Sequence, residues 1–147
     1  MPNWCRGTLK VRGTKEDLTR FIFEGLQPTR KTVKLLADEY GYIESGDTYW
    51  IENTYRGFVD GVRVVLSEYE DDAAVIALFD ARFAWGIDAE DLLKTCKKYH
   101  VDMKIKAYEK GMQFNQDIEI VGGEILKDEE IKFDNYKWDC DCPTVGG

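Results

Sequence analysis

The fold is decided by residues 74–108, which read AVIALFDARFAWGIDAEDLLKTCKKYHVDMKIKAY. Residues 74–85 are apolar on both sides, which predicts a central strand of a sheet. Residues 88–100 combine a helix-capping aspartate with apolar side chains at helical spacing, which predicts a helix. Residues 101–108 then alternate between apolar and polar side chains, as in a strand with one buried face. The stretch therefore predicts a strand, a helix and a second strand in succession.

A strand and a helix are also expected at the start of the chain. Residues 5–11 alternate in the pattern of a half-buried strand, which Gly13 ends. Thr14 can cap a helix over residues 15–26, because its apolar side chains recur at helical spacing. Pro28 is expected to bring that helix to a close.

The segment after this helix predicts an insertion. Residues 29–60 mix short apolar runs with turn residues, and we expect short strands there near residues 34–36 and 49–52. Residues 62–69 (VRVVLSEY) predict a further strand, and the acidic residues 70–72 predict a turn before the central strand.

Gly122 and Gly123 stand between two β-rich runs, a strong signal for a hairpin with a two-residue turn. Ile131 and Phe133 are expected to continue the return strand. The order of elements is a βαββαβ plan, which predicts an α+β ferredoxin-like sandwich. We expect a four-stranded antiparallel sheet with both helices on one face, an insertion after the first helix and a C-terminal β-hairpin. Residues 1–138 would form this domain, and residues 139–147 a short tail.

The composition favours one globular domain, since the chain has 147 residues, of which 44 % are hydrophobic and 33 % charged. No run approaches the roughly 18 apolar residues of a membrane span, and the start lacks a signal-peptide pattern. We therefore expect a cytoplasmic protein with no membrane partner. The four cysteines are too scattered for a disulfide framework, so reduced thiols are expected.

Two stretches of the chain, MPNWC at residues 1–5 and AWGIDAEDLLKTCKKYHVDMKIKAYEKGMQF at residues 84–114, resemble the YubB-like ferredoxin-like-domain proteins of phages, plasmids and integrated elements. The second stretch places a tryptophan turn before a helix and a strand that ends with Glu109 and Gly111. The resemblance implies a ferredoxin-like fold and a mobile-element origin, and it supplies no catalytic residues. We interpret Trp4 as an anchor packed under the sheet edge.

Residues that could carry catalysis or bind metal have simpler interpretations. His100 stands between a helix and a strand without a partnered nucleophile, which favours a helix-capping role over a general base. Cys140 and Cys142 form one C-x-C, whereas structural zinc sites usually repeat such a pair, so thiols near the surface are expected. The pairs Asp71-Asp72 and Glu129-Glu130 are interpreted as solvated turns rather than magnesium ligands. We expect no cofactor, no metal and no catalysis, with a small nuclease-like enzyme as the last alternative.

The C-terminal part of the chain is acidic, since residues 117–147 hold nine Asp or Glu against three Lys or Arg. Aromatic residues stand among these carboxylates, a mixture typical of recognition surfaces. The first hypothesis is a non-enzymatic protein-binding module of mobile-element origin, whose acidic surface meets a basic surface on a host or element-encoded protein. Its sharper form is interference with a host defence or regulatory protein. The candidate residues are Asp128, Glu129, Glu130, Phe133, Tyr136 and Trp138. The alternative is that these rings close the core.

The second hypothesis is binding of RNA or single-stranded nucleic acid on the open face of the sheet, where related sheets stack bases on aromatic rings. By alternation, a basic strip with one aromatic faces away from the core: Arg6, Lys10, Arg12, Lys104, Lys106 and Tyr108. The net charge of −8 argues against non-specific binding, although residues 1–36 carry eight Lys or Arg against three Asp or Glu. The alternative is that these charges pair with one another.

Overall fold

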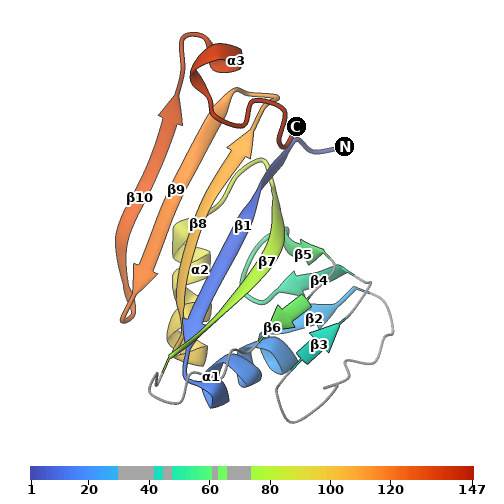
Figure 1. Cartoon of the computed structure of the whole chain (residues 1–147), viewed down its shortest axis with the longest axis vertical. Coiled ribbons are helices and arrows are strands. Elements are labelled where there is room, and N and C mark those ends of the chain that lie inside the picture. Colours follow the sequence, from blue (N-terminus) through green and yellow to red (C-terminus); the bar gives the residue numbers. More distant parts are fainter. Residues whose placement is uncertain (30–41, 45–47, 61–62, 66–73) are drawn as a thin grey trace.

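The computed structural model describes residues 1–29, 42–44, 48–60, 63–65 and 74–147. Within these residues the chain forms an eight-stranded antiparallel sheet and a separate two-stranded sheet (Figure 1). The large sheet has the spatial order β10 (Glu124–Lys132), β9 (Phe114–Val121), β8 (Asp102–Glu109), β1 (Trp4–Gly13), β7 (Val75–Ala84), β5 (Gly57–Asp60), β4 (Thr48–Ile51) and β2 (Leu26–Pro28). The small sheet pairs β3 (Tyr42–Glu44) with β6 (Arg63–Val65).

The expected antiparallel α+β architecture is confirmed, but the expected size of the sheet was wrong. A four-stranded sheet was expected, with the insertion and the hairpin as additions to it, and the described sheet has eight strands. On one side, the β9–β10 hairpin continues the sheet beyond β8. On the other side, β5, β4 and β2 from the insertion continue it beyond β7. The expected strand at residues 49–52 is β4, whereas the strand expected at residues 34–36 and the turn expected at residues 70–72 lie outside the described residues. The described part of the strand expected at residues 62–69 is β6, which lies in the small sheet, and β5 is the neighbour of β7 instead.

Both long helical segments pack on the same face of the sheet. One is α1 (Lys15–Arg20) with the π-helical turn η1 (Phe21–Gly25), and the other is α2 (Ala89–Tyr99) (Figure 1). Leu18 and Leu92 from the two helices join Leu9 and Ile105 from the sheet in a single buried core. β7 lies between β1 and β5, as expected for a central strand.

The helix caps follow the sequence signals. Thr14 Oγ1 accepts a hydrogen bond from the Asp17 N–H at 3.1 Å, and the Asp88 carboxylate accepts one from the Glu90 N–H at 3.0 Å. His100 ends α2 in the left-handed conformation with φ 56°. The first helix was expected to reach residue 26, but Leu26 begins β2. The buried Leu26 side chain joins the core from β2, which pairs with β4.

The turn after β8 is organised by a buried carboxylate. Glu109 is fully buried and accepts hydrogen bonds from the N–H groups of Gly111 at 2.6 Å and Met112 at 2.7 Å. A Cβ atom at Gly111 would lie 2.6 Å from Asn3 Nδ2 and 2.8 Å from Glu109 Oε1, so a side chain there would require these two side chains to move. This arrangement accounts for the glutamate that ends the strand and the glycine that comes after it.

The β9–β10 hairpin turns at Gly122 and Gly123, as expected. Both glycines have positive φ, at 60° and 75°, which a two-residue turn of this hand requires. The return strand ends at Lys132, so it includes Ile131 but not Phe133. A register shift between Ile125 and Lys127 leaves Leu126 as the irregular residue of this edge strand.

The end of the chain folds back onto the sheet. The short helix α3 (Tyr136–Asp139) leads into residues 140–147, here named the C-terminal segment. The Gly147 N–H donates to the Trp4 carbonyl at 2.8 Å, which brings the two ends of the described chain together (Figure 1). Among the described residues, none of the helices has the length and apolar character that crossing a membrane requires.

Candidate binding groove on the open face of the sheet

The face of the sheet that carries no long helix, here named the open face, is set by the alternation of β1. Leu9 and Val11 point into the core, so Arg6, Thr8 and Lys10 point the other way. Residues paired directly across antiparallel strands share a face, so the register extends the open face to the other strands. One cross-strand row on it contains Lys106, Thr8, Asp80 and Asp60.

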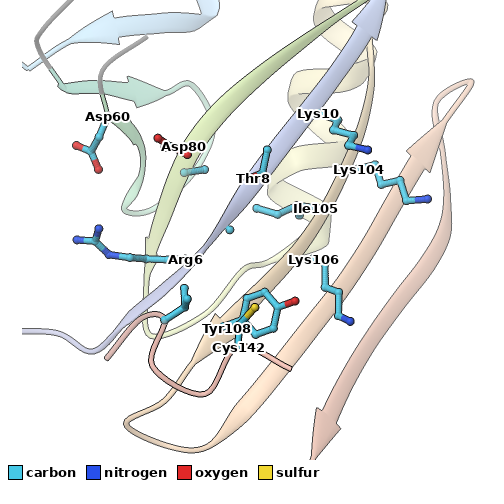
Figure 2. Close-up of a pocket in the computed structure, with 13 residues that line it drawn as sticks. Arg6, Thr8, Lys10, Asp60, Asp80, Lys104, Ile105, Lys106, Tyr108 and Cys142 are labelled. Atoms are coloured by element: carbon cyan, nitrogen blue, oxygen red, sulfur yellow. The ribbon is translucent and has the colours of Figure 1, made fainter. Parts of the chain in front are cut away.

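A hollow of about 630 Å³ lies on this face, and we name it the sheet groove. A volume of this size is in the range of ligand-binding clefts, roughly 300–1,000 Å³. Figure 2 shows its side chains, which come from β5, β7, β1, β8 and the C-terminal segment. The lining residues are Arg6, Gly7, Thr8, Lys10, Asp60, Asp80, Ala81, Lys104, Ile105, Lys106, Tyr108, Cys142 and Val145.

One side of the sheet groove is cationic. Lys10 on β1 lies directly opposite Lys104 on β8, and Lys106 follows on the same face (Figure 2). Like charges directly opposite each other destabilise a sheet. Within the described part of the chain, neither Lys10 nor Lys104 has a carboxylate within 4.0 Å, so no ion pair offsets this repulsion. On its other side Lys104 lies directly opposite Glu119 of β9, whereas Lys10 faces Leu78 of β7, so an opposite charge offsets the repulsion in part at Lys104 but not at Lys10.

The other side of the sheet groove is acidic. Asp60 on β5 lies directly opposite Asp80 on β7. Thr48 donates its hydroxyl to Asp60 Oδ1 at 2.7 Å, and Arg82 Nε lies 2.7 Å from Asp60 Oδ2 in an ion pair. Asp80 has no such partner among the described residues, and it is exposed. The groove is thus dipolar, with lysines and carboxylates on opposite sides (Figure 2).

Trp4 belongs to the open face rather than under the sheet edge, which corrects the interpretation from the sequence. Its ring meets Phe58 edge-on at 6.1 Å between centroids, and the Arg82 guanidinium lies 4.5 Å from the Trp4 centroid. The Arg56 guanidinium also lies 5.7 Å from that centroid. Such cation–π contacts stabilise arginines beside aromatic rings. Trp4 therefore contributes to a cluster of aromatic and arginine side chains that adjoins the groove.

The C-terminal segment closes one end of the sheet groove. Asp141 Oδ2 accepts a hydrogen bond from the Tyr108 hydroxyl at 3.2 Å and lies 3.5 Å from Lys106 Nζ. Burial acts to raise the pKa of the Asp141 carboxyl, but these two partners outweigh it and lower that pKa. The pKa of Tyr108 is raised by burial, by a hydrogen bond with Cys142 and by the Asp141 charge. At neutral pH the contact therefore joins a neutral phenol to a carboxylate.

The structure brings together five of the six residues of the predicted basic strip. Arg6, Lys10, Lys104, Lys106 and Tyr108 all line the sheet groove. The sixth, Arg12, forms an ion pair with Asp102 at 2.9 Å and lines a neighbouring hollow of about 230 Å³. The alternative was that the charges of this strip pair with one another, whereas the carboxylates that meet Arg12 and Lys106 are Asp102 and Asp141, outside the strip.

The structure does not gather the predicted acidic surface on one face. Asp128 and Glu130 pair with Ile118 and Gln116 and so face the helical side, whereas Glu129 pairs with Asp117 on the open face. The aromatic residues also separate: Tyr136 is buried against Phe133 at 5.6 Å between centroids, while Trp138 is 82 % exposed. Tyr136 also donates its hydroxyl to Asn115 Oδ1 at 2.9 Å. For Tyr136 the alternative of a ring that closes the core is correct.

Other candidates from the sequence do not form a site among the described residues. His100 is exposed at the end of α2, and Cys140 is buried beside Asn115, contrary to the expected surface position, while Cys142 is half-buried. No group of three His, Cys, Asp or Glu side chains in the described ranges is placed to hold a metal ion. Glu129 and Glu130 were expected in a turn but lie in strand β10, where Glu129 is 3.8 Å from Lys127, and Asp71-Asp72 lies outside the described residues.

Sequence reasoning missed the acidic side of the sheet groove. Asp80 and Arg82 occupy alternate positions of residues 74–85, so the alternation itself was a usable signal that these polar residues share one face. Asp60 gave no comparable signal, because it lies in a short strand of the insertion. Comparisons of the chain with protein-family models, with curated proteins and with solved structures found no match.

Proposed function

We propose that the protein is a non-enzymatic binding module that holds a single-stranded nucleic-acid chain in the sheet groove. The observation that carries this proposal is that Lys10 and Lys104 lie directly opposite each other. Neither has a carboxylate within 4.0 Å among the described residues. Two opposed lysines lower the stability of the fold, and Arg6 and Lys106 add two further cations to the groove. This arrangement suits a ligand that is negatively charged. Phosphates supply that charge at regular intervals along a chain.

Other features support a nucleic-acid chain over an isolated anion. The groove runs across four strands, and Tyr108 stands beside its lysines, where a base can stack on the ring. Asp80 offers carboxylate oxygens on the opposite side, where they can accept hydrogen bonds from exocyclic amino groups of bases. The net charge of −8 does not oppose this proposal, because the cations are concentrated at the groove.

The architecture fits the same proposal. The strands β8, β1, β7 and β5 are neighbours in that order, with α1 and α2 on one face, which supports a ferredoxin-like βαββαβ core extended on both sides. Such cores present an open sheet face to single-stranded RNA in several nucleic-acid-binding modules. A YubB-like origin in a mobile element is part of the same proposal and rests on the MPNWC and 84–114 stretches.

The test is a binding titration with fluorescently labelled single-stranded oligouridylate at several salt concentrations. We expect a Kd of roughly 1–100 µM at physiological salt, typical of non-specific binding. Replacing both Lys10 and Lys104 with Gln should weaken binding about tenfold. It should also lower the salt dependence, because each phosphate contact to a single strand contributes about 0.7 to the slope of the logarithm of the binding constant against the logarithm of the salt concentration. The matched control replaces Lys94 and Lys97 of α2 with Gln. An equal loss of affinity in both double variants, or no binding by the parent protein, would refute the proposal.

A second candidate function is binding of a protein with a basic surface, favoured by one observation. Trp138 is 82 % exposed in α3, and the carboxylates of Asp128, Glu129 and Glu130 lie exposed on the edge strand β10. Exposed tryptophan is a frequent energetic anchor of interfaces. The proposed partner is a host or element-encoded protein, including one of host defence or regulation. Once a partner is identified, changing the three acidic residues to Lys should slow association and abolish its salt dependence.

A further inference from the structure

Asp141 places a carboxylate against two residues on the cationic side of the sheet groove. Its Oδ2 contacts both Tyr108 and Lys106, at 3.2 Å and 3.5 Å. A carboxylate and a phosphate are both acceptor-only anions, and both are recognised by an ammonium and a hydroxyl donor. Lys106 and Tyr108 therefore form a site for an acidic oxygen, and the chain itself supplies one.

Backbone contacts of residues 142–147 hold in place the segment that carries Asp141. The Gly147 N–H donates to the Trp4 carbonyl at 2.8 Å, and the Val145 N–H donates to the Cys142 carbonyl at 3.2 Å. Gly146 has φ 81°, and a Cβ there would lie 2.3 Å from the Tyr108 carbonyl oxygen. The close approach of this backbone to Tyr108 keeps Cys142 and Val145 in the wall of the groove.

We propose that the Asp141 carboxylate occupies a phosphate subsite formed by Lys106 and Tyr108, so that the C-terminal segment and a nucleic-acid chain compete for this end of the sheet groove. The inference rests on the proposed function, because it assigns one subsite of the same groove. It also adds a regulatory element, since any event that withdraws the segment would open the subsite.

The side-chain contacts of Asp141 have the strength that a displaceable occupant requires. The Lys106 side chain is 48 % exposed and the Asp141 side chain 60 % exposed, so water and salt screen their attraction. Exposed ion pairs of this kind contribute little to stability. A phosphate carries further acceptor oxygens and is tethered to neighbouring phosphates that can meet Lys104 and Lys10, so it can replace the carboxylate.

The test compares Asp141→Asn with Asp139→Asn, which removes the same charge two residues earlier. Asp139 is exposed in α3, and it has no ion pair among the described residues. With labelled single-stranded oligouridylate as the probe, Asp141→Asn should bind about two- to fivefold more tightly than the parent, as expected for release of one exposed ion pair. Asp139→Asn should match the parent. Equal tightening in both variants, or no tightening in Asp141→Asn, would overturn the competition.

A second measurement follows the segment itself. Hydrogen exchange of a C-terminal peptide that contains Val145 and Gly147 should become faster when oligouridylate is added to the parent protein, because the segment is displaced. Slower or unchanged exchange under saturating oligouridylate would overturn the inference while leaving the proposed function intact. If neither the parent nor Asp141→Asn binds the oligonucleotide, the proposed function itself fails, so the two failures are distinguishable.

Discussion

Lys10 and Lys104 lie directly opposite each other on the neighbouring strands β1 and β8, with both side chains exposed on the open face. On its other side, Lys10 faces Leu78 of β7, so no charge on that strand compensates it. Lys104 faces Glu119 of β9 on its other side, so Lys10 is the member of this repulsive pair that has no opposite charge across from it. In the proposed function, the phosphates of the ligand relieve the repulsion.

The first prediction is that Lys10→Glu stabilises the fold while it weakens nucleic-acid binding. The change converts a like-charge pair into an opposite-charge pair, which should raise the free energy of unfolding by about 0.2–1 kcal/mol. Urea denaturation measures the first effect, and the oligouridylate titration measures the second. Lys10→Gln should give an intermediate stability. A loss of stability in Lys10→Glu would contradict the repulsion that we infer.

The second prediction concerns Glu52, which links the end of β4 to α2. Its carboxylate accepts hydrogen bonds from Lys98 Nζ at 2.5 Å and from the Tyr99 hydroxyl. Burial acts to raise the pKa of Glu52, but the hydrogen bonds from Lys98 and Tyr99 outweigh it and lower that pKa below its ordinary 4.5.

A carboxyl whose pKa is lower in the folded state stabilises the protein above its unfolded pKa, and that stability is lost as the pH falls through the folded pKa. Glu52→Gln should therefore lower the free energy of unfolding at pH 7 by about 1 kcal/mol, a typical value for a charged hydrogen bond that is partly exposed. The difference from the parent should shrink between pH 5 and pH 3, which are approximate bounds set by the carboxyl pKa. A difference that stays constant on acidification would contradict the assignment.

The third prediction is that Glu109→Ala destabilises the protein by about 1–3 kcal/mol, because it removes the buried carboxylate that accepts hydrogen bonds from the N–H groups of Gly111 and Met112. Glu109→Gln retains one acceptor oxygen and should lose less stability than Glu109→Ala. Thermal or urea unfolding of the two variants provides the comparison. Equal losses in both would show that the negative charge, not the hydrogen bonding, organises the turn.

The fourth prediction concerns thiol reactivity. Burial, with smaller contributions from nearby carboxylates, raises the pKa of both Cys5 and Cys96 to about 12. Since the thiolate is the reactive form, neither thiol should be alkylated in the folded protein at pH 8. Cys142 is half-buried at the groove and should react first with iodoacetamide. Peptide mass spectrometry identifies the modified residues, and alkylation of Cys5 before Cys142 would be the contrary result.

The fifth prediction separates His100 from function. Because His100 adopts a left-handed conformation at the end of α2, His100→Gly should raise the free energy of unfolding by roughly 0.5–1 kcal/mol. His100→Ala should leave oligouridylate binding unchanged, since His100 lies outside the sheet groove. Weaker binding by a fully folded His100→Ala protein would assign this histidine a part in the function.

The local elements of this protein could be predicted because their signals are encoded within a few residues. Thr14 and Asp88 cap the helices through hydrogen bonds to N–H groups two or three residues away. Gly122 and Gly123 define a turn by their own positive φ angles. The alternation of residues 101–108 placed Lys104, Lys106 and Tyr108 on one face before any strand pairing was known.

The size of the sheet and the composition of the groove were decided only by tertiary pairing. Asp60 reaches Asp80 through the register of β5 on β7, and Asp141 reaches Lys106 and Tyr108 because the chain folds back after β10. Trp4 likewise takes its place on the open face through contacts with Phe58 and Arg82, although a tryptophan before a strand fits a buried anchor equally well. Periodicity reports which residues share a face of one element, whereas a site assembled from five segments depends on long-range packing that no local pattern encodes.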